Sequence, residues 1–480
     1  MRVAVVHGYF LGDSGSAIYT RELARELTRT GHEVTLVCQE QHPEEYGFID
    51  SLYCFGEDNA QPVAVFERDP PYAGTCRMVR PHLGGRILTY VAGPFPPFEA
   101  TPFQDAPDEW IQAYVEANVA AMSAVGDYWP QDLIVANHAV MQPYVVREAL
   151  GGRAPYIVTI HGSELNFTVS RDARLEPYMA AGLSGAAAVA ALSANSRDQV
   201  VDMAAGLGID ISDKTVVLSP GVDTQLFIPA ADRSPALHTV SPGIDPLNDD
   251  IVVFAGRLLW TKGLQYVVAA LPVILRQRPR FQLVVVGDGP MRPALEKLIS
   301  AIEAGDIGAA RMLVEREPEF KAPAEYGPVI PDMDSESERL YRESSARGLA
   351  AHIHFTGHLP HERLAPLFGA ADLSLAPSVF PEAFGLVSIE ALSAGALPIA
   401  TYQTGLRAPL DMIVELLGDE GFKRLGPGCG LTEALAGAVI SSLSRYSTRA
   451  PDFREKLHRC AEETFSWRAV ARRYLEYAAS

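Results

Sequence analysis

Two glutamates flank a glycine-containing loop in the segment Phe380–Leu397, which reads FPEAFGLVSIEALSAGAL. Glu382 lies in the loop, and Glu390 lies in the helix that the apolar spacing predicts from Leu386 to Gly395. The first N–H groups of a helix have no backbone partner and carry partial positive charge, so they can bind an anion. We expect these groups on three residues: Phe384, Gly385 and Leu386. The two carboxylates can accept hydrogen bonds from sugar hydroxyls, so the segment suits a sugar nucleotide. The alternative is an acidic surface helix.

Two cations are expected at the end of one strand in the second half of the chain. The run DIVVFAGRL predicts a strand from which Arg257 emerges, and Lys262 precedes the start of the next helix. A positive charge at a helix start opposes the helix dipole, so its placement there is unfavourable unless an anion binds. The pair therefore predicts a phosphate-binding site; the alternative is an ordinary surface arginine and lysine.

Two histidines fall at the ends of strands in the first half. DLIVANH ends in His138, and YIVTIHG contains His161. In open α/β sheets the carboxyl ends of the strands are where ligands bind, although a single histidine there is also compatible with a structural role. The loop after the first strand contains Gly12 and Gly15, which do not form the G-x-G-x-x-G fingerprint of dinucleotide-binding folds.

Short apolar runs alternate with helical patterns in both halves, which predicts an α/β fold with parallel sheets. A chain of 480 residues is too long for one ordinary domain and fits two. A polar, Pro-rich run at about 229–249 fits a linker between them.

Composition excludes several classes of function. The content of 48% hydrophobic and 21% charged residues is that of a soluble globular protein, and a net charge of −19 repels nucleic acid and anionic lipid. Five scattered cysteines without a C-x-x-C pair argue against a disulfide framework and structural zinc. The start of the chain has no basic-then-apolar leader, and no apolar run approaches the roughly 20 residues that span a bilayer. We expect a cytoplasmic protein with no nucleic-acid partner, and membrane association is not expected.

The chain resembles the retaining glycosyltransferases of family 4, which have the GT-B fold. GRLLWTKG (Gly256–Gly263) is similar to the family's Gly-Arg-x-x-x-x-Lys-Gly motif. The glutamate motif of the family is matched at Pro377, Ser378, Glu382, Phe384, Gly385, Glu390 and Ala391. The resemblance is weakest at 40–130, 301–350 and 401–430. It implies two Rossmann-like, doubly wound domains that face each other across a cleft, an acceptor-side domain over 1–228 and a donor-side domain over 229–460. The donor-side domain would include the linker at about 229–249 and a surface insertion, relative to the family's usual spacing, at about 301–350. A last helix in 461–480 would cross back to the first domain.

The resemblance also implies roles for individual residues. The catalytic residues would be Arg257, Lys262, Glu382 and His161, the last preferred over His138. Donor binding would involve Gly15, Gly287, His358, Leu359, Phe384, Gly385, Leu386 and Glu390. In this assignment Glu382 orients the donor sugar and Glu390 the ribose. The family usually has Gly-Gly where this chain has Ser14-Gly15, and the other interpretation of Gly15 is a simple helix start capped by Asp13 or Ser14. Gly287 also fits a simple turn.

The resemblance implies an enzyme, a hexosyltransferase that moves a hexose from a UDP- or GDP-sugar to a hydroxyl with retention, forming an α-glycosidic bond. We expect a small soluble acceptor and neither a cofactor nor a metal ion; a homo-oligomer is left open. One alternative is a catalytically silent nucleotide-sugar-binding protein. Another is a GT-B-fold epimerase or phosphorylase.

Overall fold

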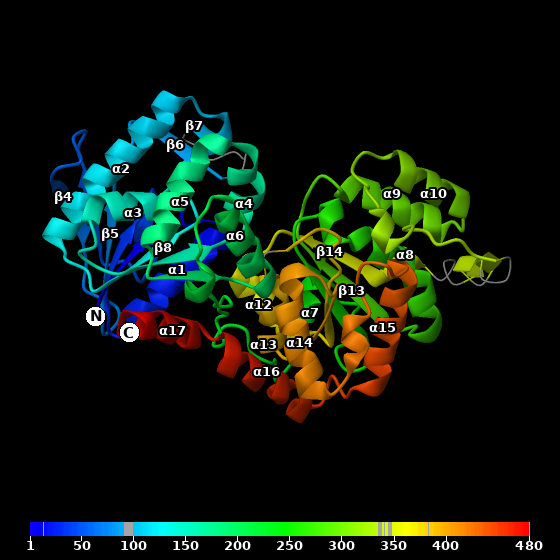
Figure 1. The fold of residues 1–480 in the computed structure, drawn as a ribbon. Helices are drawn as coiled ribbons and strands as arrows, with labels where there is room; N and C mark the ends of the chain where they lie inside the picture. The colour runs from blue at the N-terminus through cyan, green and yellow to red at the C-terminus, as the bar shows by residue number, and fades with distance from the viewer. Residues whose placement is uncertain are drawn as a thin grey trace. The chain divides into compact units, whose positions relative to one another are not determined.

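The chain folds into two compact units, each with its own sheet (Figure 1). The computed structural model describes residues 1–12, 14–90, 99–334, 338–339, 341–343, 348–382 and 384–479. Unit 1 consists of Met1–Gly221 and Trp467–Ser480, and unit 2 consists of Val222–Ser466. The sequence suggested boundaries at 228 and 460. The structure instead places 222–228 and 461–466 in unit 2 as well.

Unit 1 is built on a nine-stranded sheet, counted over the described residues, in the order β11-β10-β9-β8-β1-β2-β5-β3-β4. Its strands are β1 (Arg2–Val6), β2 (Glu33–Val37), β3 (Ser51–Phe55), β4 (Pro62–Glu67), β5 (Thr75–Arg80), β8 (Leu133–Asn137), β9 (Tyr156–Ile160), β10 (Ala188–Ala191) and β11 (Thr215–Val217). All pairs are parallel except β3 with β4. The central strands β8 and β9 are buried along their whole length, as expected for a parallel sheet covered on both faces. A separate parallel pair is formed by β6 (Arg86–Thr89) and β7 (Glu99–Pro102).

Strand β4 forms one edge of this sheet and is the least buried of its strands. Val63 is 62% exposed and Val65 is 59% exposed. Beyond β4 the sheet has no further strand in the described part of unit 1. An apolar, antiparallel edge strand therefore lies open to solvent.

Helices cover both faces of the sheet of unit 1. α1 (Gly15–Arg29) connects β1 to β2, whereas α3 (Gln142–Leu150) connects β8 to β9 in the opposite direction along the sheet. Because such crossovers are right-handed, the two helices lie on opposite faces. The other helices are α2 (Asp108–Tyr128), α4 (Ser163–Phe167), α5 (Glu176–Gly185), α6 (Ala194–Gly206) and α17 (Trp467–Ala479).

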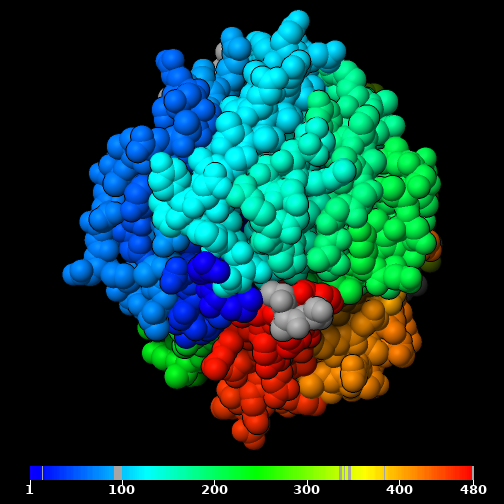
Figure 2. Space-filling model, turned by 60° about the vertical axis from the view of Figure 1, so that its left-hand side comes forward, coloured from blue at the N-terminus to red at the C-terminus, as the bar shows by residue number. Residues whose placement is uncertain are grey.

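The last helix, α17, packs on α1 within unit 1. The hydroxyls of Tyr19 and Tyr474 are 2.9 Å apart, and the Tyr474 hydroxyl is 2.8 Å from Thr159 Oγ1 on β9. The ring of Trp467 meets the ring of Tyr19 edge-on at 5.2 Å. In Figure 2 red residues of the C-terminal segment accordingly lie beside the deep-blue N-terminal residues. The C-terminal segment thus completes the unit in which the chain begins.

Unit 2 is built on a five-stranded parallel sheet, counted over the described residues, in the order β14-β13-β12-β15-β16. Its strands are β12 (Asp250–Ala255), β13 (Phe281–Val286), β14 (Ile353–Gly357), β15 (Leu373–Ala376) and β16 (Leu397–Ala400). Its helices are α7 (Ser234–Val240), α8 (Leu264–Gln277), α9 (Arg292–Glu303), α10 (Ile307–Arg316), α12 (His361–Ala370), α13 (Leu386–Ser393), α14 (Arg407–Leu417), α15 (Leu431–Arg445) and α16 (Pro451–Phe465).

Two segments that the sequence set apart are folded parts of unit 2. The segment 229–249, expected as a linker, contains α7, and Arg233 just before this helix pairs with the buried Asp372 at 2.8 Å. The segment 301–350, expected as a surface insertion, contains α10, which packs on α9. Residues 335–337, 340 and 344–347 of this segment lie outside the described residues.

In each sheet the direction of the connections reverses once. The reversal lies between β1 and β8 in unit 1 and between β12 and β15 in unit 2. At such a switch point the loops at the carboxyl ends of the two strands diverge and leave room for a ligand. The site residues that the sequence predicts follow these four strands or their neighbours.

Candidate functional site

The centre of the candidate site in unit 2 is an ion pair between the two loops of its switch point. Lys262 Nζ, after β12, lies 2.5 Å from Glu382 Oε1, after β15. The same oxygen accepts a hydrogen bond of 2.6 Å from Ser378 Oγ. The side chains of Lys262 and Glu382 are 33% and 20% exposed, so the pair can be reached by a ligand.

Backbone hydrogen bonds fix these two loops. The N–H of Val379 donates to the carbonyl of Thr261 at 2.8 Å, which ties one loop to the other. The N–H of Glu382 donates to Thr404 Oγ1 at 2.9 Å, and its carbonyl accepts from the N–H of Gly405 at 2.9 Å. Residues after β16 therefore hold Glu382 against Lys262.

Two glycines are required because neighbouring strand ends approach each other closely. Gly263 has φ +74°, and a Cβ there would lie 1.9 Å from the carbonyl oxygen of Pro377. Gly287 has φ +135°, and a Cβ there would lie 1.9 Å from the carbonyl oxygen of Gly256. The N–H of Gly287 also donates to Gly357 at 2.8 Å. The geometry at Gly287 is thus accounted for by backbone packing, and its contact with a donor stays a prediction.

Helix α13 begins directly after the Glu382 loop. Gly385 precedes it with φ 81°, a conformation that favours glycine, and no side chain caps the helix. Leu386 is its first residue, as the apolar spacing predicts. The ring of Phe384 is buried against Phe465 at 5.8 Å, so Phe384 can offer a ligand only its backbone. These first N–H groups can receive an anion.

The second glutamate, Glu390, is held by a residue that the sequence analysis did not select. His361 Nε2, at the start of α12, lies 3.3 Å from Glu390 Oε1. The Glu390 side chain is only 12% exposed. A signal for His361 was present in the sequence, because it follows the loop with His358 and Leu359 by two residues.

The other residues of unit 2 that the sequence analysis assigned to the site make fewer contacts. The Arg257 side chain is exposed and forms no hydrogen bond or ion pair with any residue that the structure describes. His358 is exposed and Leu359 is half-buried in the loop after β14. The structure thus pairs Lys262 with Glu382 shortly before the start of α13, and leaves Arg257 and His358 open to solvent.

In unit 1 a buried network surrounds His161 at the ends of β8 and β9. The Asn137 amide donates its N–H to Val6 O at 3.1 Å, which turns its oxygen toward His161 Nε2 at 2.8 Å. His161 Nε2 therefore carries the proton, and Nδ1 is an acceptor. Burial, and next His138, lower the pKa of His161 well below its ordinary value, so the ring is neutral.

His138 belongs to the same network. Its Nδ1 lies 3.2 Å from Glu164 Oε2, while Glu164 Oε1 accepts the N–H groups of His161 at 2.9 Å and Ala139 at 3.3 Å. Burial lowers the pKa of His138 to about 3 and raises the pKa of Glu164. The backbone of His138 has φ 71°, which is rare for a residue other than glycine and is held here by its surroundings. Sequence reasoning treated the two histidines as alternatives and missed Glu164, although HGSEL places it three residues after His161.

Gly15 is the first residue of α1, and Ser14 caps this helix. The N–H of Ala17 donates to Ser14 Oγ at 3.2 Å, whereas a Cβ at Gly15 would meet nothing within 4 Å. The helix-start interpretation accounts for this geometry, and a donor contact at Gly15 stays a prediction. Asp13, the other cap considered, lies outside the described residues.

Among the residues that the structure describes, no cluster of three or more His, Cys, Asp or Glu side chains is arranged to hold a metal ion. None of the helices described is both long and apolar enough to cross a membrane.

Two family models match this chain. The Glycosyl transferase 4-like domain matches residues 14–221, and Glycosyl transferases group 1 matches residues 243–307 and 327–412. Together they cover most of both units.

Among characterised proteins the chain is similar to D-inositol 3-phosphate glycosyltransferases. That of Corynebacterium jeikeium is 29% identical over 195 residues, which are 41% of this chain and 37% of that protein. That of Corynebacterium glutamicum is 27% identical over 280 residues, which are 58% of this chain and 54% of that protein. The matched part of the chain thus spans about two fifths to about half of these relatives.

Solved structures resemble the whole chain at low sequence identity. Sucrose-phosphate synthase from Thermosynechococcus elongatus has a TM-score of 0.60 and 21% identity, with 100% of both chains covered. Anabaena Alr3699/HepE in complex with UDP has a TM-score of 0.59 and 15% identity, again with 100% of both chains covered. These likenesses show the fold, and with the two family models they lead to one conclusion: the chain has the GT-B fold and belongs to glycosyltransferase family 4, the group 1 glycosyl transferases.

Proposed function

We propose that this protein transfers a hexose from a nucleoside diphosphate sugar to an acceptor hydroxyl with retention of the anomeric configuration. One observation carries this proposal: the Lys262–Glu382 pair lies at the switch point of the unit 2 sheet, and Glu382 is four residues before Leu386, the first residue of the uncapped helix α13. A cation next to open helix N–H groups suits a diphosphate, and a carboxylate beside both suits a sugar hydroxyl.

The charges at this site fit the departure of a diphosphate. As the glycosidic bond breaks, negative charge grows on the leaving phosphate, and preorganised donors that face it lower the barrier. Lys262 and the N–H groups of Gly385 and Leu386 would bind this phosphate, and the exposed Arg257 would add a second cation. Glu382 holds Lys262 in place and has a second oxygen left for the donor sugar. Glu390, held by His361, would accept from the ribose.

The proposed step needs no nucleophilic side chain. The bond between the anomeric carbon and the phosphate oxygen breaks, and the acceptor oxygen forms its bond to that carbon on the same face. The acceptor proton moves to the departing phosphate oxygen, so atoms and charges balance. We propose that Lys262, Arg257 and the helix start supply the stabilisation without a divalent ion, so activity in excess EDTA should equal activity with magnesium.

The relatives suggest which substrates to test first. The HepE structure contains UDP, and the named relatives act on D-inositol 3-phosphate. We therefore propose UDP-sugars as first donors and a polyol phosphate such as D-inositol 3-phosphate as first acceptor. The five cysteines are all free, which fits a reducing compartment, and we propose that the reaction takes place in the cytoplasm.

A donor screen with product analysis tests the proposal. The purified protein is incubated with UDP-, GDP- and ADP-hexoses and the polyol phosphate, and the anomeric coupling constant of the product is read by NMR. We expect one donor to give an α-linked product that requires the acceptor. An inverted product would refute retention. Turnover that needs inorganic phosphate would identify a phosphorylase, acceptor-free conversion of the donor an epimerase, and binding without turnover a silent protein.

A further inference from the structure

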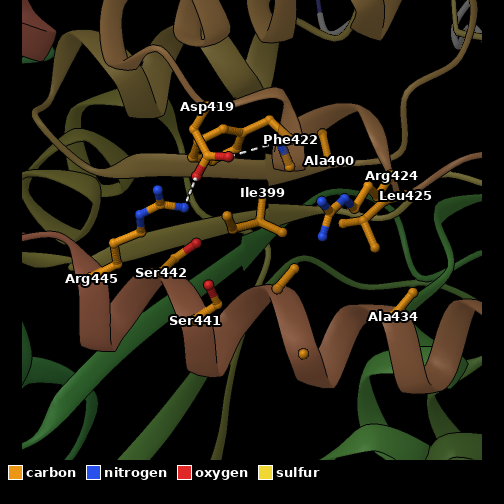
Figure 3. A pocket seen from close by; sticks show the side chains of 13 residues that line it. Ile399, Ala400, Asp419, Phe422, Arg424, Leu425, Ala434, Ser441, Ser442 and Arg445 are labelled. Carbon is orange, nitrogen blue, oxygen red and sulfur yellow. Dashed lines mark hydrogen bonds and ion pairs between the residues drawn. The ribbon is translucent and has the colours of Figure 1, made fainter.

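Unit 2 contains a cavity that the proposed reaction does not use. Its volume is about 390 Å³, within the range of small-molecule sites. It lies between the end of β16, the 3₁₀ turn Glu420–Lys423 and helix α15 (Figure 3). Its apolar wall consists of Ile399, Ala400, Phe422, Leu425 and Ala434.

Helix α15 presents small residues to this cavity along most of its length, and Arg445 at its last position. Ala434, Gly437, Ala438 and Ser441 recur at the spacing of one helix face, where a core-facing helix would normally carry large apolar side chains. Glycine inside a helix is unfavourable, and Gly437 is not required by crowding, because a Cβ there would meet nothing within 4 Å. The sequence thus keeps open a space that ordinary side chains would fill.

Two polar groups without partners face this space. Ser442 is 5% exposed, and its hydroxyl has no hydrogen-bond partner among the residues that the structure describes. By contrast, the hydroxyl of Ser444 on the same helix donates back to Ile440 O at 2.7 Å. The Arg424 guanidinium likewise makes no hydrogen bond or ion pair with any described residue, and Figure 3 shows it pointing toward Ile399.

The other charges at the cavity neutralise each other. Arg445 Nη1 lies 2.8 Å from Asp419 Oδ2, and the Tyr446 hydroxyl donates to the same carboxylate at 2.6 Å. The Tyr446 hydroxyl and the N–H of Gly421 hold the pKa of Asp419 below its usual value, so this carboxylate is charged. Arg424 is exposed and also attracts Asp419, so the cavity carries two guanidinium groups against one carboxylate, in a protein with net charge −19.

We propose that this cavity binds a small organic anion, a phosphate monoester or a carboxylate with an apolar body. Arg424 binds the acid group, since a guanidinium matches both carboxylate and phosphate oxygens in a bidentate manner. The Ser442 hydroxyl hydrogen-bonds the ligand, whose body lies against Ile399, Phe422 and Leu425. The small face of α15 gives the ligand its room.

Hydrogen bonds connect this cavity to the Glu382 loop. The N–H of Tyr402 donates to the carbonyl of Leu425 in the cavity wall. Its neighbour Thr401 donates through Oγ1 to Ser378 O at 2.6 Å, and Thr404 Oγ1 accepts from the N–H of Glu382 at 2.9 Å. Occupation of the cavity would shift the segment that holds Glu382 against Lys262. We therefore infer that the anion changes donor affinity; this part rests on the proposed function.

Calorimetry on the whole protein without nucleotide tests the cavity itself. The probes are phenyl phosphate and benzoate, with inorganic phosphate and neutral benzyl alcohol as comparisons. We expect phenyl phosphate or benzoate to bind saturably, and inorganic phosphate and benzyl alcohol at least tenfold more weakly. Whichever of the two anions binds better identifies the acid group. Failure of both to bind overturns the proposal.

Three variants locate the binding. Arg424→Gln removes the charge, and Gly437→Leu fills the cavity from a position where a side chain meets no atom. Each should weaken probe binding at least tenfold. Arg459→Gln is the control, because Arg459 is 65% exposed and pairs with Glu455 on the surface of α16. Binding that is unchanged in both cavity variants would place the probe elsewhere and overturn the proposal.

The coupling is measured as the dissociation constant of the best-binding nucleotide, with and without saturating probe. We expect a change of at least threefold, and the same factor in the probe's affinity with and without nucleotide, because coupling is reciprocal. Equal affinities overturn the coupling. Absence of any nucleotide binding refutes the proposed function instead. It does not affect the test of the cavity, because that calorimetry is done without nucleotide.

Discussion

Lys262 and Glu382 are 120 residues apart in the chain and form one ion pair. The motifs predict both residues from the sequence, but as separate contacts to a donor. The contact between them depends on β12 and β15 being neighbours, which local spacing does not reveal. Glu382 therefore neutralises part of the charge of Lys262.

Replacement of Lys262 by alanine tests this pair. Lys262→Ala should lower kcat/KM for transfer by about 10²- to 10³-fold, because a preorganised donor to the leaving group is lost. The fold should persist, since the side chain is one third exposed. Steady-state kinetics and circular dichroism check both statements. Lys297→Ala is the matched control, because Lys297 pairs with Glu317 at 2.6 Å in the same unit; equal losses in the two variants would refute the role of Lys262.

The histidine network makes unit 1 sensitive to acid. The pKa of His138 is about 3 in the folded protein and about 6.5 ordinarily, so below pH 6.5 the unfolded chain binds a proton that the folded chain does not. This contribution to stability is complete above about pH 6.5 and is lost as the pH falls toward 3. His138→Asn should therefore show a shallower fall of unfolding free energy between pH 6.5 and 4 than the wild type.

Asparagine suits this test because it tolerates the positive φ of His138. Urea unfolding at a series of pH values measures the slopes, and exposed His42→Asn serves as the control. Parallel slopes in wild type and His138→Asn would contradict the assignment.

The sequence analysis missed three residues that hold predicted site residues in place: Asn137, Glu164 and His361. Asn137 on β8 contacts His161 after β9, and His361 on α12 contacts Glu390 on α13. Glu164 is close in sequence to one of its partners, the N–H of His161. Sequence spacing reveals which residue emerges from a strand end, but not which buried carboxylate receives its hydrogen bond.

At the scale of elements, we expect replacement by alanine to change the unfolding free energy in opposite directions at two glycines of unit 2. Gly263→Ala should lower the unfolding free energy by about 2 kcal/mol or more, because its φ is positive and a Cβ would collide with Pro377 O. Gly437→Ala should raise it by about 0.5–1 kcal/mol, because it lies inside α15 and a Cβ meets no atom. Denaturant unfolding measures both. A lower unfolding free energy for Gly437→Ala would show that α15 has no free space beside Gly437.

Strands and helices were predictable where their patterns were strong. The runs that became β1, β8, β9, β12 and β13 are continuous and apolar, and parallel burial requires such runs. Helix α7 was hidden in a polar, Pro-rich stretch that suggests a linker. Its proline lies in the first turn, where proline favours a helix start rather than preventing it.

At the scale of the whole chain, the C-terminal helix α17 belongs to the unit formed by the first residues. The hydroxyl of Tyr474 joins α1 and β9, so Tyr474→Phe removes two buried hydrogen bonds. We expect the unfolding free energy of unit 1 to fall by about 1–3 kcal/mol. Thermal or urea unfolding followed with probes in each unit checks this value. Tyr128→Phe, at a half-exposed tyrosine, is the control and should change it little; equal behaviour of the two variants would refute the role of Tyr474.

The GT-B fold was predictable from the sequence because two motifs and two rounds of strand–helix alternation pointed to it. The cavity beside α15 was not, because its wall combines β16, a 3₁₀ turn and one helix face. The sequence there departs from the family's pattern, at 401–430, so no motif marked it.

The open edge at β4 has a consequence for handling the protein. Val63 and Val65 are exposed on a strand whose outer backbone groups can pair with another chain. Concentrated solutions, and salt that screens the mutual repulsion of highly acidic molecules, should favour aggregation that starts at this strand. A lysine at either valine would hinder such association without disturbing the buried layers of the sheet.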